Sequence, residues 1–209
     1  MNIYPKVSSD LRFIFEDRFI LEEGVYRAYT TDEKMNIDQK ETQYIMKYIS
    51  NPVKIGNLIL GGGAPIVVQT MCNTHTSDVE ASFSQCARLA EAGAQMIRLT
   101  VPSLAQVDSI AEIRSRLRSN GIDVPIVADV HFSSEIAIAA AAVVDKVRIN
   151  PGNFHRDHNK AREQFSKLVA VCKEHGTALR VGVNHGSLGE RITELYGNTS
   201  FAMKEAAME

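Results

Sequence analysis

The chain has 209 residues, 44% of them hydrophobic, and its 23 basic and 25 acidic side chains give a net charge of −2 at pH 7. This composition is typical of a soluble globular protein, and the absence of a run of about 18 apolar residues excludes a membrane-spanning helix. The near-neutral charge argues against a general nucleic-acid binder, so we expect no nucleic-acid and no membrane partner.

Two further features bear on the compartment. The first residues lack the apolar core of a signal peptide, so export is not expected. The three cysteines, Cys72, Cys86 and Cys172, are widely spaced and form no C-x-x-C pair. This spacing argues against a disulfide framework and against a self-contained zinc or iron–sulfur site, and it favours a cytoplasmic protein.

The chain changes character near residue 50. Residues 1–50 contain many aromatic and charged side chains but a single glycine, Gly24. We treat them as an N-terminal segment of unknown role, for which a helical or disordered cap is the simplest expectation. The second part, residues 51–209, begins with VKIGNLILGGGAP, which predicts a small hairpin with a glycine-rich turn. The GGGAP run lacks the G-K-[ST] ending and the following helix of a phosphate loop.

Apolar runs then alternate with amphipathic stretches. The runs are rich in β-branched residues, as buried parallel strands are. The stretches between them have helical periodicity, and three of them end in glycine. Asp78 and the Ser133–Ser134 pair are expected to supply N-caps. The predicted strands cover 65–71, 94–101, 124–132, 145–152 and 177–184, and the predicted helices cover 78–93, 104–121, 134–144 and 157–176.

This alternation predicts an α/β fold built from βαβ units around a parallel sheet. The spacing of the strands suits a (β/α) TIM-type barrel or a doubly wound sheet. A complete barrel needs about 250 residues, so the residues after position 50 suffice for about five units. We therefore expect a partial barrel that belongs to a longer protein, with residues 192–209 beginning a sixth unit.

Polar side chains gather where the predicted strands end, which is where parallel α/β folds bind ligands. Residues two apart share a face of a strand, so three arginines from three strands are expected to converge on one side. Clustered guanidinium groups need an anionic partner, and a phosphate or diphosphate suits them. The candidate binding residues are Arg98, Asp129, His131, Arg148, Asn150, Arg180 and Asn184.

Other interpretations of these residues stay open. A single arginine can face outward and pair with a carboxylate of a helix. Asp129 and His131 can hold a divalent metal, orient a substrate and shuttle a proton, or simply cap the next element and bond to the backbone. The N-P-G-N run at 150–153 predicts a tight turn, with or without amides that face an anion. Cys72 has no base beside it and is better explained as a small buried residue than as a nucleophile.

Several strings resemble one known family at its own spacing: APIVVQTMCNTHTSDVEA, IRLTVPS, VPIVADVHF, KVRINPGN and LRVGVNHGSL. From about Pro52 to Tyr196 the chain is similar to the barrel domain of 4-hydroxy-3-methylbut-2-enyl diphosphate synthases. The resemblance implies a reductive step of the non-mevalonate isoprenoid pathway. In that step 2-C-methyl-D-erythritol 2,4-cyclodiphosphate becomes 4-hydroxy-3-methylbut-2-enyl diphosphate, with ferredoxin or flavodoxin as electron donor.

The resemblance also implies a C-terminal domain with a [4Fe-4S] cluster on three cysteines and a glutamate. The three cysteines of this chain do not fall at those positions, so the cluster ligands are not expected here, and this piece alone is expected to be inactive. By the same resemblance, Arg98, Arg148 and Asn150 hold the diphosphate. Arg180 and Asn184 lie in the matching fifth-strand segment, and Asp129 and His131 in the matching third-strand motif.

Two alternatives remain at this stage. One is another phosphate-binding barrel enzyme, such as a dihydropteroate synthase-like transferase, which needs no cluster. The other is a non-catalytic truncated chain that binds a ligand or a partner without turnover.

Overall fold

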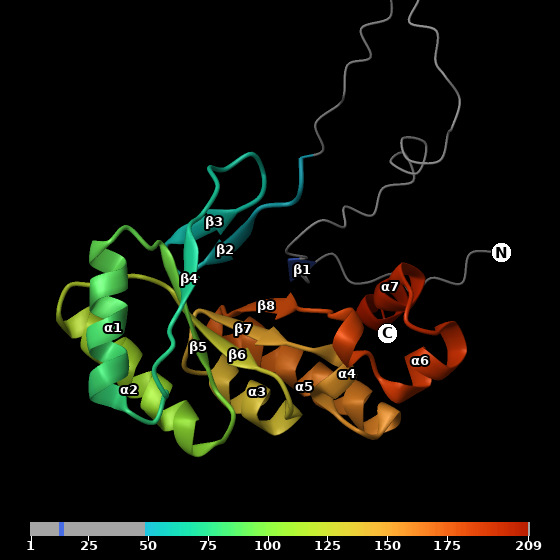
Figure 1. Cartoon of the computed structure of the whole chain (residues 1–209). Coiled ribbons are helices and arrows are strands. Elements are labelled where there is room, and N and C mark those ends of the chain that lie inside the picture. Colours follow the sequence, from blue (N-terminus) through green and yellow to red (C-terminus); the bar gives the residue numbers. More distant parts are fainter. Residues whose placement is uncertain (1–12, 15–48, 209) are drawn as a thin grey trace, which may run out of the picture.

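The computed structural model describes residues 13–14 and 49–208, the first two by their backbone alone. Its centre is a parallel sheet whose strands follow the order β1-β8-β7-β6-β5-β4 (Figure 1). The predicted α/β class is thus confirmed, and within the described residues the sheet stays open. Its strands are β1 (Phe13–Ile14), β4 (Gln69–Met71), β5 (Met96–Thr100), β6 (Ile126–Val130), β7 (Lys146–Ile149) and β8 (Ala178–Val181).

Four helices cover one face of this sheet, and a small hairpin lies on the other side (Figure 1). The helices are α1 (Val79–Glu91), α2 (Ala105–Ser119), α3 (Ser134–Ala141) and α5 (His158–His175). Each follows a strand of the sheet in the chain, as the alternating sequence pattern predicts.

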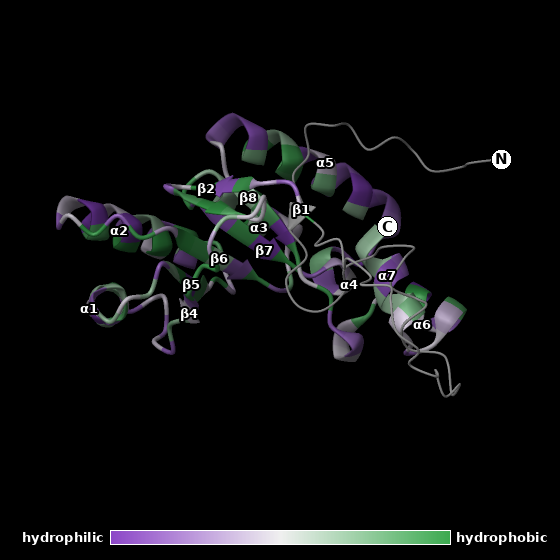
Figure 2. Ribbon diagram, turned by 90° about the horizontal axis from the view of Figure 1, so that it is seen from above, coloured by the Kyte–Doolittle hydropathy of each residue, from purple (hydrophilic) through white to green (hydrophobic). Residues whose placement is uncertain are grey.

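The two faces of the sheet differ in chemistry because side chains alternate along a strand. Residues such as Ile97, Ala128 and Val147 point to the helices and belong to the main hydrophobic core. Their neighbours on the opposite face include Arg98 and Asp129. In Figure 2 hydrophilic residues accordingly interrupt the hydrophobic strands. The helix-facing residues stabilise the fold, so the opposite face is left for polar groups.

The hairpin consists of β2 (Val53–Ile55) and β3 (Leu58–Leu60). Val53 and Ile55 pack with residues at the amino ends of the strands, where they bury that end of the inner face. The predicted hairpin is confirmed, but its turn was misplaced. The turn is Gly56–Asn57, with Gly56 at φ 55°, whereas the glycine run follows β3 and its Gly62 N–H donates to the Ser50 carbonyl (2.9 Å).

Strand β4 is shorter than the predicted 65–71. Within the described sheet it has one neighbour, β5, and its ladder begins only at Gln69. Before the ladder, the carbonyl of Val68 accepts from the amides of Gln95 (2.9 Å) and Met96 (3.2 Å), whereas Ile66 is 95% exposed.

The helix caps follow the sequence closely. Asp78 accepts a hydrogen bond from the amide of Ala81, and Ser133 accepts one from that of Ile136, as predicted. Gly176 closes α5 at φ 67°, where a side chain would be strained. These local signals place the helix ends, and hence the loops that carry the polar residues.

Two predictions after the fourth strand were wrong in detail. Residues 150–153 do not form a plain turn: Asn150 caps a short helix, α4 (Pro151–Phe154), with proline at its first position. The last residues do not begin a new strand. They form η2 (His185–Ser187), α6 (Glu190–Tyr196) and α7 (Ser200–Met208), and α6 and α7 pack together through small and aliphatic side chains.

The N-terminal segment contributes strand β1, which pairs in parallel with β8 through Phe13–Leu179 and Ile14–Arg180. The expectation of a purely helical or disordered cap is therefore wrong, because part of the segment forms a strand of the sheet. The rest of the predicted segment up to residue 48 lies outside the described residues. In the part of the chain that the structure describes, no helix is both long and apolar enough to cross a membrane.

Asp145 ties the helix layer to the amino end of the sheet. Its carboxylate accepts from Arg114 (2.7 and 3.1 Å), from Arg118 (3.1 Å) and from the amide of Ile126 (2.9 Å). The carboxylate is almost fully buried, so it depends on these donors.

We expect Asp145→Ala to lower the free energy of unfolding by at least about 2 kcal/mol, since it leaves two cations and a buried amide without their acceptor. The matched control is Glu80→Ala, which removes the exposed Glu80–Arg116 pair (2.6 Å) and should cost about 0–1 kcal/mol. Urea unfolding followed by circular dichroism measures both. Equal losses would show that Asp145 does not anchor the layers.

Candidate functional site

The register of the sheet brings the predicted polar residues together on its inner face. Thr100 pairs with Asp129, Asp129 with Arg148, and Arg148 with Arg180. Paired positions in neighbouring strands point the same way, so these side chains form one row across four strands. The row lies near the carboxyl ends of the strands.

Asp129 is the centre of this row. Its carboxylate is 1% exposed and forms ion pairs with Arg98 (Nη2–Oδ2, 3.0 Å) and Arg148 (Nη1–Oδ1, 3.3 Å). Arg98 also donates through Nε to the same oxygen (3.2 Å). One buried carboxylate thus holds two guanidinium groups from the strands on either side.

Arg148 lies in a crowded electropositive environment. Burial lowers its pKa below the ordinary arginine value, the carboxylate of Asp129 opposes this shift, and the charges of Arg180 and Arg98 add to it. Arg148 is therefore close enough to both other arginines for their charges to affect it. Arg98 lies two residues before Thr100 on the same face of β5, and Arg98, Arg148 and Arg180 around Asp129 form what we call the arginine row. Three positive charges and one negative charge make this row electropositive.

His131 extends the cluster toward solvent, with its side chain 36% exposed. Its Nε2 lies 2.6 Å from Arg148 Nη1 and 3.1 Å from Asp129 Oδ2. Arg148 Nη1 can only donate and Asp129 Oδ2 can only accept, so the tautomer of His131 decides which of these two contacts is a hydrogen bond. In either tautomer the ring links the buried ion pairs to the partly exposed edge of the cluster.

Asn150 and Asn184 organise loops beside the cluster. Asn150 is 2% exposed, accepts from the amide of Gly152 (3.2 Å) and donates to Ser187 Oγ (2.7 Å). Asn184 is exposed and accepts from the amide of Gly186 (3.0 Å). Of the predicted binding residues, the structure joins Arg98, Asp129, His131 and Arg148 directly, places Arg180 beside them, and gives the two asparagines capping roles.

Two glycines matter that sequence reasoning did not single out for this role. A Cβ at Gly182 would meet the Arg148 guanidinium, with Cζ and Nη2 at 3.0 Å, so the arginine lies flat against the bare backbone. A Cβ at Gly152 would meet the carbonyl oxygen of Ser187. The sequence did contain an indication for Gly182. This residue directly follows β8 and lies two positions after Arg180, so it continues the face of the strand that carries Arg180.

A cleft of about 540 Å³ opens next to the cluster, between the loops after β6 and β7. Its walls include Phe132, Ser134, Asn153 and Arg156, and it contains none of the three clustered arginines. The charge and the hollow are thus adjacent but separate in this structure.

The described residues do not form a metal site. No group of three or more histidine, cysteine, aspartate or glutamate side chains in residues 49–208 is arranged to hold an ion. Among the residues that the structure describes, the close polar partners of Asp129 and His131 are each other and two arginines, which disfavours their metal interpretation. The three cysteines likewise form no three-ligand set, so these residues do not fit an iron–sulfur cluster.

Comparison with known proteins identifies the relationship. The model of the GcpE TIM-barrel domain matches residues 50–209, which is most of the chain. The chain belongs to the GcpE family. This membership confirms the resemblance seen in the strand-end motifs and favours it over a dihydropteroate synthase-like transferase.

Curated relatives in the GcpE family carry the expected name. The chain is 42% identical over 177 residues to 4-hydroxy-3-methylbut-2-en-1-yl diphosphate synthase (flavodoxin) of Chlorobaculum tepidum, covering 77% of this chain and 24% of that protein. It is 42% identical to the ferredoxin enzyme of Trichormus variabilis, covering 77% and 44%. A ferredoxin enzyme of Prochlorococcus marinus is 40% identical, covering 87% and 50%.

The chain thus spans between about a quarter and a half of the length of these GcpE relatives. The alignment that covers 87% of the chain must extend into the N-terminal segment, because residues 51–209 alone make up a smaller share.

We expect Gly182→Ala to lower the free energy of unfolding by about 1–3 kcal/mol, because the new methyl group displaces the Arg148 guanidinium. Gly186→Ala is the control, since its nearest atom would be 3.6 Å away. In a double-mutant cycle with Arg148→Ala, the cost at position 182 should shrink. An unchanged cost would show that the glycine does not serve the arginine.

Proposed function

We propose that this chain is the diphosphate-binding barrel part of a 4-hydroxy-3-methylbut-2-enyl diphosphate synthase. The substrate is 2-C-methyl-D-erythritol 2,4-cyclodiphosphate, which takes up two electrons, opens its ring and loses a hydroxyl group as water. The names of the GcpE relatives support the reaction. The part that we assign to the residues of this chain is binding of the diphosphate.

The observation that carries the proposal is the arginine row around Asp129. A buried carboxylate fixes Arg98 and Arg148 in place, and Arg180 pairs in register beside them. Guanidinium groups bind phosphate oxygens through paired charge-assisted hydrogen bonds. The net charge of this row suits a ligand with two phosphate groups.

Each residue then has a distinct part. Arg98 is anchored through Nε and Nη2, which leaves its remaining amino group to turn toward an anion. Arg148 is anchored to Asp129 through Nη1, whereas its Nη2 donates over a long distance to the Gly182 carbonyl (3.4 Å), a bond that a phosphate oxygen can replace at a shorter distance. His131 touches both Arg148 and Asp129 and is partly exposed, which places its ring where it can contact the bound molecule. Asn150 and Asn184 keep the surrounding loops in position.

The residues described above do not supply the groups that would transfer electrons to the substrate. The proposed enzyme uses a [4Fe-4S] cluster, and a flavodoxin or ferredoxin, as in the relatives' names, donates the electrons. The described residues fit no such cluster, so their contribution is to bind and orient the diphosphate.

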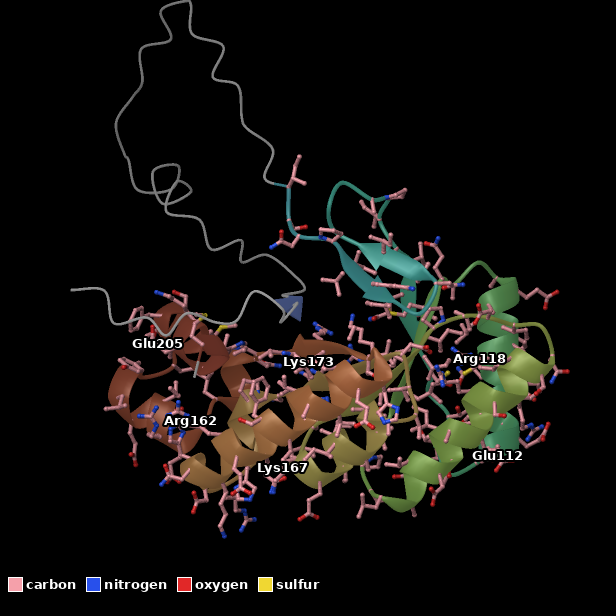
Figure 3. The ribbon with its side chains drawn as sticks, turned by 180° about the vertical axis from the view of Figure 1, so that it is seen from behind. Glu112, Arg118, Arg162, Lys167, Lys173 and Glu205 are labelled. Atoms are coloured by element: carbon pink, nitrogen blue, oxygen red, sulfur yellow. The ribbon has the colours of Figure 1, made fainter. Side chains whose placement is uncertain are left out.

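Isothermal titration of this chain with the cyclodiphosphate tests the proposal. We expect binding that weakens at least tenfold in Arg148→Ala, since a hydrogen bond to a charged group is worth about 1.5–3 kcal/mol. Arg162→Ala makes the same change of charge on the exposed surface of α5 (Figure 3) and should leave the affinity unchanged.

Two results would contradict the proposal. One is no binding by a chain whose circular dichroism shows it folded. The other is an equal loss of affinity in Arg148→Ala and Arg162→Ala. That result would mean that the ligand is attracted by the general positive charge of the chain and not by a specific site at Arg148.

A further inference from the structure

Two cysteines meet behind the end of β4, outside the proposed binding site. Cys72 directly follows β4 and Cys86 lies in α1, and their Sγ atoms are 3.4 Å apart. Cys72 is 7% exposed and Cys86 is fully buried. The third cysteine, Cys172, lies in α5 and is also buried. Cys72 is buried, as its sequence predicts for a small apolar residue, and it also has a thiol partner.

The loop between them is fixed to the helix that carries Cys86. Gln85 Oε1 accepts from the amides of Asn73 and Thr74 (both 3.2 Å), and its Nε2 donates to Asn73 Oδ1 (2.7 Å). One turn earlier, Ser82 Oγ lies 2.9 Å from Thr74 Oγ1. These bonds come from the residues beside Cys72 and Cys86, so the contact between the two sulfurs is held on both sides.

The two thiols are chemically unequal. The hydrogen bond from Cys86 lowers the pKa of Cys72 below its ordinary value, whereas the same bond and burial raise the pKa of Cys86. Burial alone raises the pKa of Cys172 to about 11. The thiolate is the reactive form, so Cys72 is the first of the three to react with an oxidant.

We propose that Cys72 and Cys86 form a redox modification site, at which a small two-electron oxidant such as hydrogen peroxide creates a reversible intramolecular disulfide. The Cys72 thiolate attacks a peroxide oxygen, the O–O bond breaks, and a sulfenic acid forms as hydroxide leaves and takes up a proton to become water. The Cys86 sulfur then displaces the sulfenic oxygen as a second water. Two thiols lose two electrons and two protons, and one peroxide becomes two waters.

The movement required is small. A disulfide bond is about 2.05 Å long, so the sulfurs approach each other by about 1.4 Å. The backbone amide of Cys72 donates to the carbonyl oxygen of Arg98 (2.9 Å), so the pair lies one hydrogen bond from β5, the strand that carries Arg98.

The test is peptide mapping of the full chain after treatment with one equivalent of hydrogen peroxide. Free thiols are alkylated under denaturing conditions before digestion, and the linked peptides are identified by mass. We expect Cys72 and Cys86 in one linked peptide pair, loss of both from the alkylated fraction, and recovery of both after dithiothreitol. Cys172 should stay alkylated throughout.

The matched variants separate a pair from a single reactive thiol. Cys172→Ser should form the disulfide to the same extent as the unmodified chain, whereas Cys72→Ser should form none. If a serine variant does not fold, peptide mapping of the unmodified chain still shows whether Cys72 and Cys86 form a disulfide. The proposal fails if the linked peptides contain Cys172 or join two chains, if Cys72 is oxidised while Cys86 stays free, or if no thiol is consumed.

Discussion

The structure depends on one buried carboxylate that holds positive charge in place. Asp129 lies between Arg98 on one neighbouring strand and Arg148 on the other, and it is almost completely removed from solvent. Two guanidinium groups would repel each other at this spacing, and burying them would cost free energy. Asp129 offsets that cost only in part. The cluster is therefore stable enough to fold and still electropositive enough to attract an anion.

The sheet makes this arrangement possible by separating its two faces. The side chains that point to the helices are aliphatic and supply the hydrophobic core, so the fold does not need the inner face for stability at its carboxyl end. At the amino end the β2–β3 hairpin buries the same face with apolar residues. The inner face thus changes from a packed layer to a polar row within one or two residues of each strand. Gly182 provides the remaining requirement, which is room for a guanidinium group against the backbone.

Much of this could be predicted from the sequence because the signals were local. Alternating apolar runs and helical periodicity gave the parallel α/β fold, and Asp78, Ser133 and the terminal glycines gave the helix ends. The period of two along a strand placed Arg98, Asp129 and Arg148 on one face, and the structure brings them into contact.

The features that could not be predicted depend on the tertiary arrangement. Asn150 was assigned to the ligand, but its partner Ser187 is distant in sequence, and only the folded chain shows the amide engaged by two loops. The apolar residues at 65–68 have strand propensity but precede the ladder of the described sheet, and Ile66 among them is exposed. The contact between Cys72 and Cys86 requires the loop after β4 to turn back onto α1. The short strand β1 shows that part of the N-terminal segment joins the sheet, which its composition did not indicate.

The most direct measurement is a crystal structure of the chain grown with inorganic diphosphate. We predict that one diphosphate lies within hydrogen-bond distance of the guanidinium groups of Arg98, Arg148 and Arg180, while Arg98 and Arg148 remain paired with Asp129. An anion found only in the neighbouring cleft beside Phe132 and Arg156, or arginines that leave Asp129 for separate partners, would contradict it.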